Sequence, residues 1–406
     1  MEIKVVKTKF SMLNNAHISL LIIAGDLDLS SASYLMQRLD QGYPLKTLEA
    51  EAKVIKKFYE FCHIQNIHPP TRFSHLDRLT IGEIESLTAF YSARIDTGEV
   101  VASGTFKLRW SLTRRFIKFA WDFYQSGVKD PDMLKAAQIQ LEGMEKAFAI
   151  HGKTPYRTAN NDKIGLSPEL RAEFLDIINP AEENTKNPWK SKLVRWRNYC
   201  LFLTMILGGN RKGESLCSKL NHFKLAGSPH TRKYYEILKE DTMKSGYPRS
   251  EIPSIKTNGR QIELSDNLAA IFEYYITEIR PKFKNSTKTV YVFLSLRDGQ
   301  PLSVVTPNES LKTLVEKHPQ FEKKLTPHIL RNSFHDFLNE KLDSAFEGQG
   351  PIAKQGIKAS LQEYAGGWSS GSSMIHRYPK GSIQRRVGEL HLALQHKILE
   401  GVKDVN

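Results

Sequence analysis

The hydrophobic pattern of the chain begins with strand-like stretches and then changes to a helical period. Residues 2–10 alternate apolar and polar side chains, and residues 18–24 form the apolar run ISLLIIA, so each predicts a short strand. From Leu45 the apolar positions recur every three or four residues, as one face of a helix does. That face comprises Leu48, Ala52, Ile55, Tyr59 and Cys62. The motif HPP at 68–70 ends this helical region.

A second amphipathic helix is predicted over residues 105–126, where aromatic and basic side chains are interleaved. The aromatic residues expected to pack inward are Trp110, Phe116, Phe119 and Trp121. The basic residues, whose side chains could meet phosphates, are Lys107, Arg109, Arg114, Arg115 and Lys118. The alternative is a solvated basic face over an ordinary core. A further helix near 132–147 completes a helical domain.

The remainder of the chain predicts a second domain, as expected for 406 residues, which exceed what one hydrophobic core usually serves. Residues 151–165 carry Gly, Pro, Asn and Thr without a hydrophobic period, so they predict an exposed linker. Ser167 followed by Pro168 is typical of a helix start. The apolar run YCLFLTMILGG at 199–209 predicts a buried helix that stops at a glycine pair.

Composition adds a preferred partner and a compartment. Lys and Arg total 58 against 44 Asp and Glu, which gives a net charge of +14 and a pI near 9.4. This excess favours a polyanion such as nucleic acid; the alternative is a basic soluble protein with no nucleic-acid role. Cys62, Cys200 and Cys217 form no Cys-x-x-Cys pair, which favours a reducing cytosol and indicates no disulfide framework or zinc knuckle. The run at 18–24 is too short to span a bilayer, so a cytoplasmic protein is expected.

Two motifs in the first half of the second domain carry candidate chemistry. Arg211 follows the glycine pair closely, after Asn210, and Glu214 comes three residues later. An arginine placed just after a buried helix is held more firmly than one on a loop tip. In SIKTNGRQIELS, at 254–265, an Asn-Gly pair between two β-prone stretches predicts a hairpin, with Lys256 leading into its turn.

Two further motifs lie nearer the C-terminus. In TPHILRNSFHDFL, the Thr-Pro pair starts a helix on which His328 and Arg331 lie three residues apart on one face. In GGWSSGSSMIHRYPK, a Gly- and Ser-rich setting presents Trp368 and Tyr378.

Taken together and in this order, these motifs resemble the catalytic domain of the tyrosine recombinase (phage integrase) family. That family has an arginine with an acid three residues later, a lysine in a β-hairpin, a His-x-x-Arg, a His or Trp, and then a tyrosine. The matching residues here are Arg211 with Glu214, Lys256, His328 with Arg331, Trp368 and Tyr378. The resemblance covers residues 166–379, and the helical region before it resembles the core-binding domain of the family more loosely.

The sequence departs from the family pattern in two spacings. Arg211 and Lys256 are 45 positions apart (256 minus 211), and Arg331 and Trp368 are 37 apart (368 minus 331). Both gaps are longer than is usual for the family. We interpret the first as an extended loop and strand, in which Lys239 and Lys244 are rivals to Lys256, and the second as a Gly-rich insertion around AFEGQGPIAKQG.

The chemistry of DNA strand cleavage assigns roles to these residues. Attack on a phosphodiester builds negative charge that two arginines can bind with forked hydrogen bonds, and Arg211 and Arg331 are the candidates. Tyr378, the nucleophile, needs help to lose its proton, which nearby positive charge and His328 could supply. A lysine of lowered pKa can protonate the leaving 5′ oxygen, a role that falls to Lys256.

The two remaining motif residues have supporting roles. The indole N–H of Trp368 can donate to a phosphate oxygen, and Glu214 orients the turn that carries Arg211. The resemblance implies a 3′-phosphotyrosyl intermediate, with no metal or other cofactor. His335, His376 and Arg377 lie close to the motif and could contact DNA, although His335 is expected to belong to the helix after Arg331 and His376 could simply face solvent.

The predicted fold is multidomain, α and α+β: a helical, SAM-like core-binding domain followed by a mostly helical catalytic domain with a small antiparallel β-sheet, of the DNA breaking-rejoining type. The predicted boundaries are a β-containing extension at 1–44, the core-binding domain at 45–150, the linker at 151–165, the catalytic domain at 166–380 and a helical tail at 381–406. Residues 1–44 lack a dense basic cluster, so they are not expected to bind separate DNA sites. One face of the tail carries Ile383, Val387, Leu390, Leu394 and Ile398.

The tail either closes its own domain or, as the resemblance implies, docks on a neighbouring protomer. The function implied by the resemblance is site-specific recombination for integration or excision of a mobile genetic element. The implied partners are double-stranded DNA with specific sites, further copies of the chain in a tetramer, and accessory DNA-bending or directionality proteins, in a nucleoid-associated cytoplasmic setting with no membrane. The alternatives are a related topoisomerase or resolvase, and a catalytically inactive DNA-binding regulator with the same fold.

Overall fold

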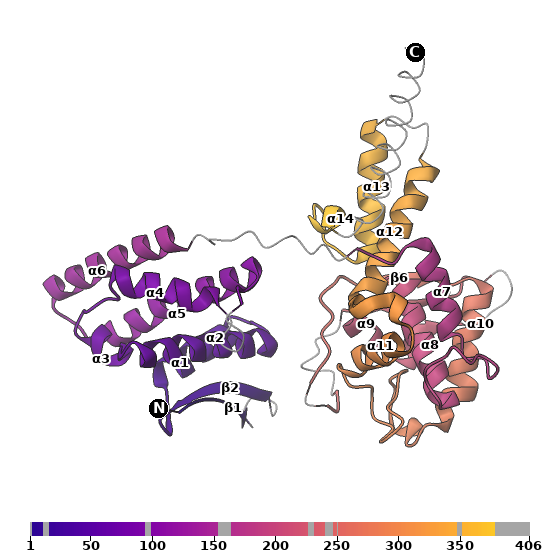
Figure 1. Ribbon diagram of the computed structural model, residues 1–406, viewed down its shortest axis with the longest axis horizontal. Coiled ribbons are helices and arrows are strands. Elements are labelled where there is room, and N and C mark those ends of the chain that lie inside the picture. The colour runs from indigo at the N-terminus through magenta and orange to yellow at the C-terminus, as the bar shows by residue number, and fades with distance from the viewer. Residues whose placement is uncertain are drawn as a thin grey trace, which may run out of the picture. The chain divides into compact units, whose positions relative to one another are not determined.

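A computed structural model describes residues 2–10, 16–93, 99–152, 164–225, 231–239, 247–249, 251–346 and 351–377 (Figure 1). The chain divides into two compact units, residues 1–160 and 161–406. Both are mostly helical, and each contains a small antiparallel sheet. Tyr378 and the predicted tail at 381–406 lie outside the described residues. Within the described ranges, no helix has both the length and the hydropathy needed to cross a bilayer.

The first unit combines a three-stranded sheet with six helices among its described residues. β1 (Ile3–Phe10) pairs with β2 (Ala16–Ile23) so that Ile3 lies opposite Ile23, and β2 pairs with the short β3 (Asp26–Leu27). The predicted strands are therefore confirmed. The helices are α1 (Leu29–Asp40), α2 (Leu45–Ile64), α3 (Pro69–Ser74), α4 (Ile81–Ser92), α5 (Ser103–Gln125) and α6 (Pro131–His151).

One hydrophobic core joins this sheet to the helices. Ile3 and Leu21 of the sheet are buried in the same cluster as Phe58 of α2 and Phe116 of α5. Figure 1 shows the two long strands lying along α1 and α2. The first 44 residues therefore share the core of the helical unit. All five apolar residues predicted for the face of α2 are buried, and so are three of the four aromatic residues predicted for α5, with Phe119 partly buried.

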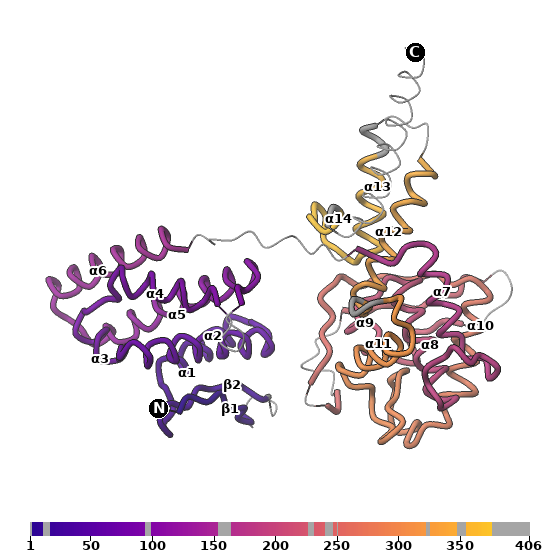
Figure 2. The backbone as a smooth tube through the Cα atoms, in the orientation of Figure 1, coloured from indigo at the N-terminus to yellow at the C-terminus, as the bar shows by residue number. Residues whose placement is uncertain are grey.

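The second unit is built around α8 (Lys192–Ile206), which is buried over most of its length. Its second half, from Cys200 to Ile206, is almost entirely apolar and buried, as expected of a helix in a core. The helices α7, α9 and α12 all contact α8 (Figure 2). Its other elements are α7 (Pro168–Ile178), α9 (Lys212–Leu216), η2 (Leu220–His222), β4 (Phe223–Lys224), β5 (Tyr234–Ile237), β6 (Arg260–Glu263), α10 (Asp266–Tyr274), η3 (Tyr275–Ile279), η4 (Arg280–Lys282), η5 (Ser286–Lys288), α11 (Thr306–Lys317), η6 (Pro319–Lys324), α12 (Pro327–Ala345), α13 (Pro351–Gly366) and α14 (Met374–Arg377).

Two predicted helix starts in this unit are confirmed by their caps. The Ser167 side chain accepts a hydrogen bond from the backbone N–H of Leu170 at the start of α7. The Thr326 side chain does the same for Ile329 at the start of α12. In both helices proline occupies the first turn, where its missing N–H costs nothing.

The hairpin predicted at Asn258-Gly259 is wrong. β6 pairs with β5, so the strands are joined by residues 238–259 and not by a two-residue turn. Asn258 and Gly259 do not have the positive φ that a type I′ turn requires. Instead, tertiary contacts hold this segment: Thr257 donates to Glu214, and the backbone N–H of Asn258 donates to the Gly367 carbonyl at 2.9 Å.

The segment between Arg331 and Trp368, which we interpret as a Gly-rich insertion, is largely helical among its described residues. α12 continues to Ala345, and α13 begins at Pro351 and packs beside α12 (Figure 1). α13 ends in a Schellman motif, in which the N–H of Trp368 bonds the Glu363 carbonyl at 2.8 Å and that of Gly367 bonds Tyr364 at 3.0 Å. Gly367 has φ +61°, which only glycine adopts without strain.

Candidate active site

The loop after α8 places Arg211 and Glu214 at the base of the candidate site. Gly209 turns the chain with a φ of +65°. A Cβ added at Gly209 would lie 2.4 Å from the ring of Phe334, so this position suits only glycine. Arg211 is then the N-cap of α9, and its backbone N–H donates to Glu214 Oε2 at 2.8 Å. This hydrogen bond closes the turn that carries Arg211.

Arg211 and Arg331 converge on one oxygen atom. Arg331 Nη2 donates to the Gly366 carbonyl at 2.9 Å, and Arg211 Nη1 donates to the same carbonyl at 3.4 Å. Arg331 Nη1 also donates to the carbonyl of Gly209. Gly366 is the last residue of α13, where carbonyls have no partner within the helix and the helix dipole favours cations. The two arginines predicted from separate motifs therefore lie side by side. The Gly366 carbonyl that joins them is far from both in the sequence, 155 positions from Arg211 and 35 from Arg331.

Glu214 lies beneath these arginines as a fully buried carboxylate. Its oxygens are 2.9 Å from Arg260 Nη2, 3.4 Å from Arg211 Nη1 and 3.7 Å from Arg331 Nη1. The Thr257 hydroxyl donates to Oε1 at 2.5 Å. Burial raises the pKa of the Glu214 carboxyl, but the charges of Arg260 and Arg331 and the hydrogen bonds from Arg260 and Thr257 outweigh burial and lower the pKa below its ordinary value. The site therefore holds an ionised glutamate surrounded by guanidinium groups.

Trp368 covers the other side of Arg331. The Arg331 guanidinium carbon is 5.8 Å from the centroid of the Trp368 ring, within cation–π range. The Trp368 ring is stacked on His335 of α12, with centroids 4.9 Å apart and planes at 27°. Burial lowers the pKa of His335 well below its ordinary value, and the charges of Arg331, Arg260 and Arg211 lower it further. His335 lies in α12, the helix that follows Arg331 in the prediction, and is thus a buried, neutral wall of the site.

The predicted residues differ sharply in their exposure. Arg331 exposes none of its side chain, whereas the Arg211 side chain is 24% exposed and His328 is exposed on the first turn of α12. Lys256 is exposed and lies one residue before Thr257, the residue bonded to Glu214. Of the two arginines, Arg211 is therefore the one with side-chain surface open to solvent.

Several predicted residues are not brought into the site by the described structure. Lys239, a rival to Lys256, is exposed just beyond β5, and Lys244 lies outside the described residues. Tyr378, the predicted nucleophile, also lies outside them, as do the side chains of His376 and Arg377. Among the residues described, no group of three or more His, Cys, Asp or Glu side chains is placed to hold a metal ion.

Sequence reasoning missed Arg260, Thr257 and the Gly366 carbonyl. Arg260 begins β6 and is buried, but an arginine in a four-residue strand gives no sign of which face it occupies. The pair Gly366-Gly367 was a usable signal, because glycine after a helix favours the Schellman geometry that presents the Gly366 carbonyl to the two arginines.

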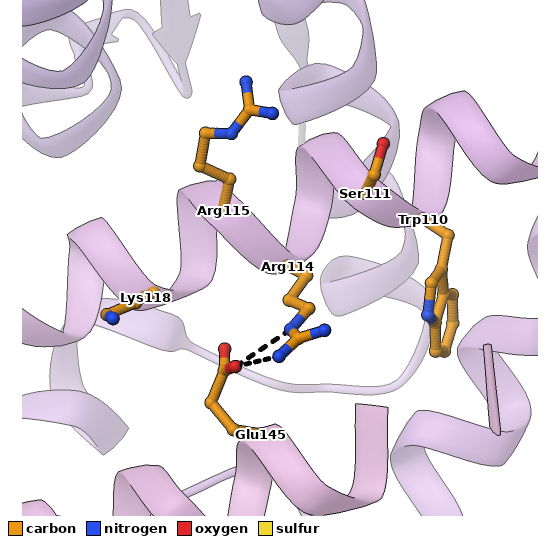
Figure 3. Close-up of a pocket in the computed structure, with 6 residues that line it drawn as sticks. All are labelled: Trp110, Ser111, Arg114, Arg115, Lys118 and Glu145. Carbon is orange, nitrogen blue, oxygen red and sulfur yellow. Dashed lines mark hydrogen bonds and ion pairs between the residues drawn. The ribbon is translucent and has the colours of Figure 1, made fainter. Parts of the chain in front are cut away.

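The basic residues predicted to contact DNA on α5 are not equally available. Arg109 Nη1 donates to the Tyr91 carbonyl at 3.0 Å, and Arg114 Nε donates to Glu145 of α6 at 2.9 Å. Figure 3 shows Arg114 and Glu145 pointing toward each other, while Arg115 points away from that pair. Lys107, Arg115 and Lys118 are exposed.

This part of α5 borders a shallow hollow of about 330 Å³. The lining residues are Trp110, Ser111, Arg114, Arg115, Lys118 and Glu145 (Figure 3). Arg115 also lies 3.5 Å from the buried Glu51, whose nearer partner is Arg38 at 2.9 Å. Lys118 and Lys107 are therefore the residues of the predicted set with the fewest competing contacts among those described.

Comparison with known proteins finds similarity in structure but not in sequence. No protein-family model matches the chain, and neither does any curated protein. One similar solved structure is a lambda integrase dimer bound to a COC′ core site, at 15% identity and a TM-score of 0.48, covering 87% of this chain and 76% of the integrase. Another is the XerH site-specific recombinase bound to its difH substrate in a pre-cleavage complex, at 15% identity and a TM-score of 0.35, covering 72% of this chain and 82% of the recombinase.

Proposed function

We propose that this protein is a tyrosine-type site-specific DNA recombinase, which cleaves and rejoins DNA strands through a 3′-phosphotyrosyl intermediate on Tyr378. The observation that carries the proposal is the convergence of Arg211 and Arg331 on the Gly366 carbonyl oxygen. Two guanidinium groups that share one oxygen acceptor form a site suited to a phosphate oxygen, because arginine forks bind phosphate with charge-assisted hydrogen bonds.

The charges at the candidate active site support the same proposal. Glu214 supplies one negative charge against the three guanidinium groups within 4 Å of it, so an excess of positive charge remains for an anion. In a buried, partly dehydrated setting such charge stabilises the extra negative charge of a pentacovalent phosphorus far better than it could in water. Cleavage by this route needs positioning and charge, and the arginines supply both.

Arg331 can reach a phosphate only if the Gly366 carbonyl moves aside, because the guanidinium has no exposed surface. A phosphate oxygen would then replace a carbonyl oxygen as the shared acceptor. We propose that DNA first meets Arg211 and that a shift of the turn at 366–368 completes the site. Such a step would couple cleavage to binding of the correct DNA.

The roles of Tyr378, His328 and Lys256 follow from the protons that must move during strand cleavage. As Tyr378 attacks phosphorus and forms the new P–O bond, its phenolic proton must leave, and the bond to the 5′ oxygen breaks. His328 and the arginine charges assist the loss of the phenolic proton, and Lys256 donates a proton to the 5′ oxygen, which departs as a hydroxyl. The phosphodiester energy is conserved in the phosphotyrosyl bond, so a second 5′ hydroxyl can reverse the reaction and join a new partner strand.

The biological setting proposed is integration or excision of a mobile element by a tetramer assembled on specific DNA sites, with accessory DNA-bending or directionality proteins. The test uses a pool of nicked half-site duplexes of randomised sequence, from which cleavage releases a short fragment and traps the enzyme. We expect wild type to form a covalent adduct that survives denaturant, and sequencing of the trapped DNA should reveal one motif. Transfer of a labelled strand to a second duplex then separates a recombinase from a topoisomerase. Absence of any adduct from wild type would refute the proposal and favour the inactive DNA-binding regulator.

A further inference from the structure

Arg260 is a buried arginine next to the candidate site that no motif of the sequence singled out. Its side chain is 1% exposed, and its Nη2 lies 2.9 Å from Glu214 Oε2. The Nε of Arg260 has no hydrogen-bond partner among the described residues. Burying a guanidinium is costly unless its charge is paired, so the Glu214 carboxylate is what makes this burial tolerable.

The three arginines lie at different distances from the Glu214 carboxylate. Arg260 is nearest at 2.9 Å, whereas Arg211 is 3.4 Å and Arg331 3.7 Å away. Arg260 is also the strongest of the charges that lower the Glu214 pKa. Without Arg260, the negative charge of Glu214 would act on Arg211 and Arg331 alone and would cancel part of the charge they offer to a phosphate.

Arg260 also touches the turn that carries the shared carbonyl. A Cβ at Gly367 would lie 2.7 Å from Arg260 Nη1, so the guanidinium and the turn are in close contact. The neighbouring residue Asn258 holds the Gly367 carbonyl through its backbone N–H at 2.9 Å. Arg260 therefore lies between Glu214 and the turn formed by residues 366–368.

We infer that Arg260 is a positioning residue for the proposed strand cleavage: it neutralises Glu214, which leaves the charges of Arg211 and Arg331 available to the scissile phosphate, and it supports the turn at 366–368. This inference rests on the proposed function. Arg260 itself does not contact the phosphate, so its effect passes through Glu214.

The test compares four variants in single-turnover cleavage of a nicked duplex recovered from the half-site pool. Arg260→Met leaves Glu214 uncompensated, and we expect adduct formation to slow by about tenfold to a hundredfold while DNA affinity stays near that of wild type. Arg260→Lys keeps the charge and should recover most of the rate. Glu214→Gln removes the competing charge, so the double variant Glu214→Gln with Arg260→Met should cleave within a few-fold of Glu214→Gln alone.

Rescue by this double variant separates an electrostatic role from a merely structural one. If Arg260 only packs the site, a second substitution cannot restore the rate, and the double variant will be at least as slow as Arg260→Met. Arg280 provides a matched control, because it is equally buried but donates only to the backbone carbonyls of Tyr291 and Thr289 among the described residues. Arg280→Met should lower stability and leave the cleavage rate of the folded enzyme unchanged.

The possible outcomes are distinguishable. If wild type forms no adduct, the proposed function fails and this inference fails with it. If wild type forms the adduct but Arg260→Met cleaves equally fast, or the double variant is not rescued, only the inference on Arg260 is overturned. Should Arg260→Met not fold, the double variant still decides, because it leaves no unpaired buried carboxylate; a rate far below that of Glu214→Gln would then contradict the inference.

Discussion

Gly367 is the position where a single methyl group tests the geometry of the candidate site most sharply. An alanine here would keep φ near +61° only at a cost of about 1–2 kcal/mol, because a Cβ clashes in the left-handed region. Its Cβ would also lie 2.7 Å from Arg260 Nη1, 2.9 Å from Thr257 Cβ and 3.0 Å from the Asn258 carbonyl. Glu214 holds Arg260 in place, so the guanidinium cannot swing away. Overpacking of this kind typically costs about 1–3 kcal/mol.

Gly367→Ala should therefore destabilise the second unit by about 2–5 kcal/mol in total. It should also slow adduct formation, because the clash with Arg260 and Thr257 distorts the contacts of these residues with Glu214. Gly371 is the matched control: its φ is +72°, but a Cβ there would meet nothing within 4 Å. Gly371→Ala should cost only the backbone strain, about 1–2 kcal/mol.

Native-state hydrogen exchange of peptides from α8 and α12 measures the stability of the second unit alone, which matters because a chain of two units need not unfold in one step. The reasoning is refuted if Gly367→Ala is no more destabilising than Gly371→Ala, or if Gly367→Ala cleaves DNA at the wild-type rate.

Three further predictions test separate parts of the protein. Burial holds the pKa of His335 well below 6.5 in the folded chain. Below pH 6.5 the unfolded chain therefore binds a proton at this histidine that the folded chain does not bind. The free energy of unfolding should then fall by about 1.4 kcal/mol for each pH unit, from pH 6.5 down to the folded-state pKa. His335→Phe, which can keep the stacking on Trp368, should lack that slope in hydrogen exchange, and an equal slope in both proteins would contradict the buried neutral histidine. If Lys256 is the general acid, Lys256→Met should cleave ordinary DNA slowly but regain its rate on DNA with sulfur at the 5′ bridging position, since a thiol of pKa about 8.5 leaves without protonation; rescue of Lys239→Met or Lys244→Met instead would reassign the role. On α5, Lys107→Ala with Lys118→Ala should reduce the slope of log affinity against log salt by about 0.9 for each phosphate that the variant no longer neutralises. Lys53→Ala, whose lysine pairs with Glu49 at 2.8 Å, should leave the slope unchanged.

The sequence predicted those features that depend on local patterns. The period of α2, the caps at Ser167 and Thr326, and the helix that stops before Arg211 all follow from residues within a few positions of one another. The nearness of Arg211 to Arg331 could not follow from such patterns, because it depends on how α8, α12 and α13 pack. It was anticipated only through the resemblance of the ordered motif.

The failures share one physical cause. The Asn258-Gly259 pair has the local signature of a hairpin turn, but its neighbours are held by Glu214 and by the end of α13, so tertiary bonds override the local preference. Arg260 escaped notice for the same reason, since only the fold shows that a buried carboxylate faces it.

The identity of the DNA-linked residue tests the central claim most directly. The adduct formed by wild type with a nicked duplex would be denatured, digested with trypsin and nuclease, and sequenced by mass spectrometry. We predict a nucleotide on Tyr378 joined through a 3′ phosphate, a free 5′ hydroxyl on the released strand, and no adduct from Tyr378→Phe. A nucleotide on another residue, a 5′ linkage, or an adduct that persists in Tyr378→Phe would contradict the assignment.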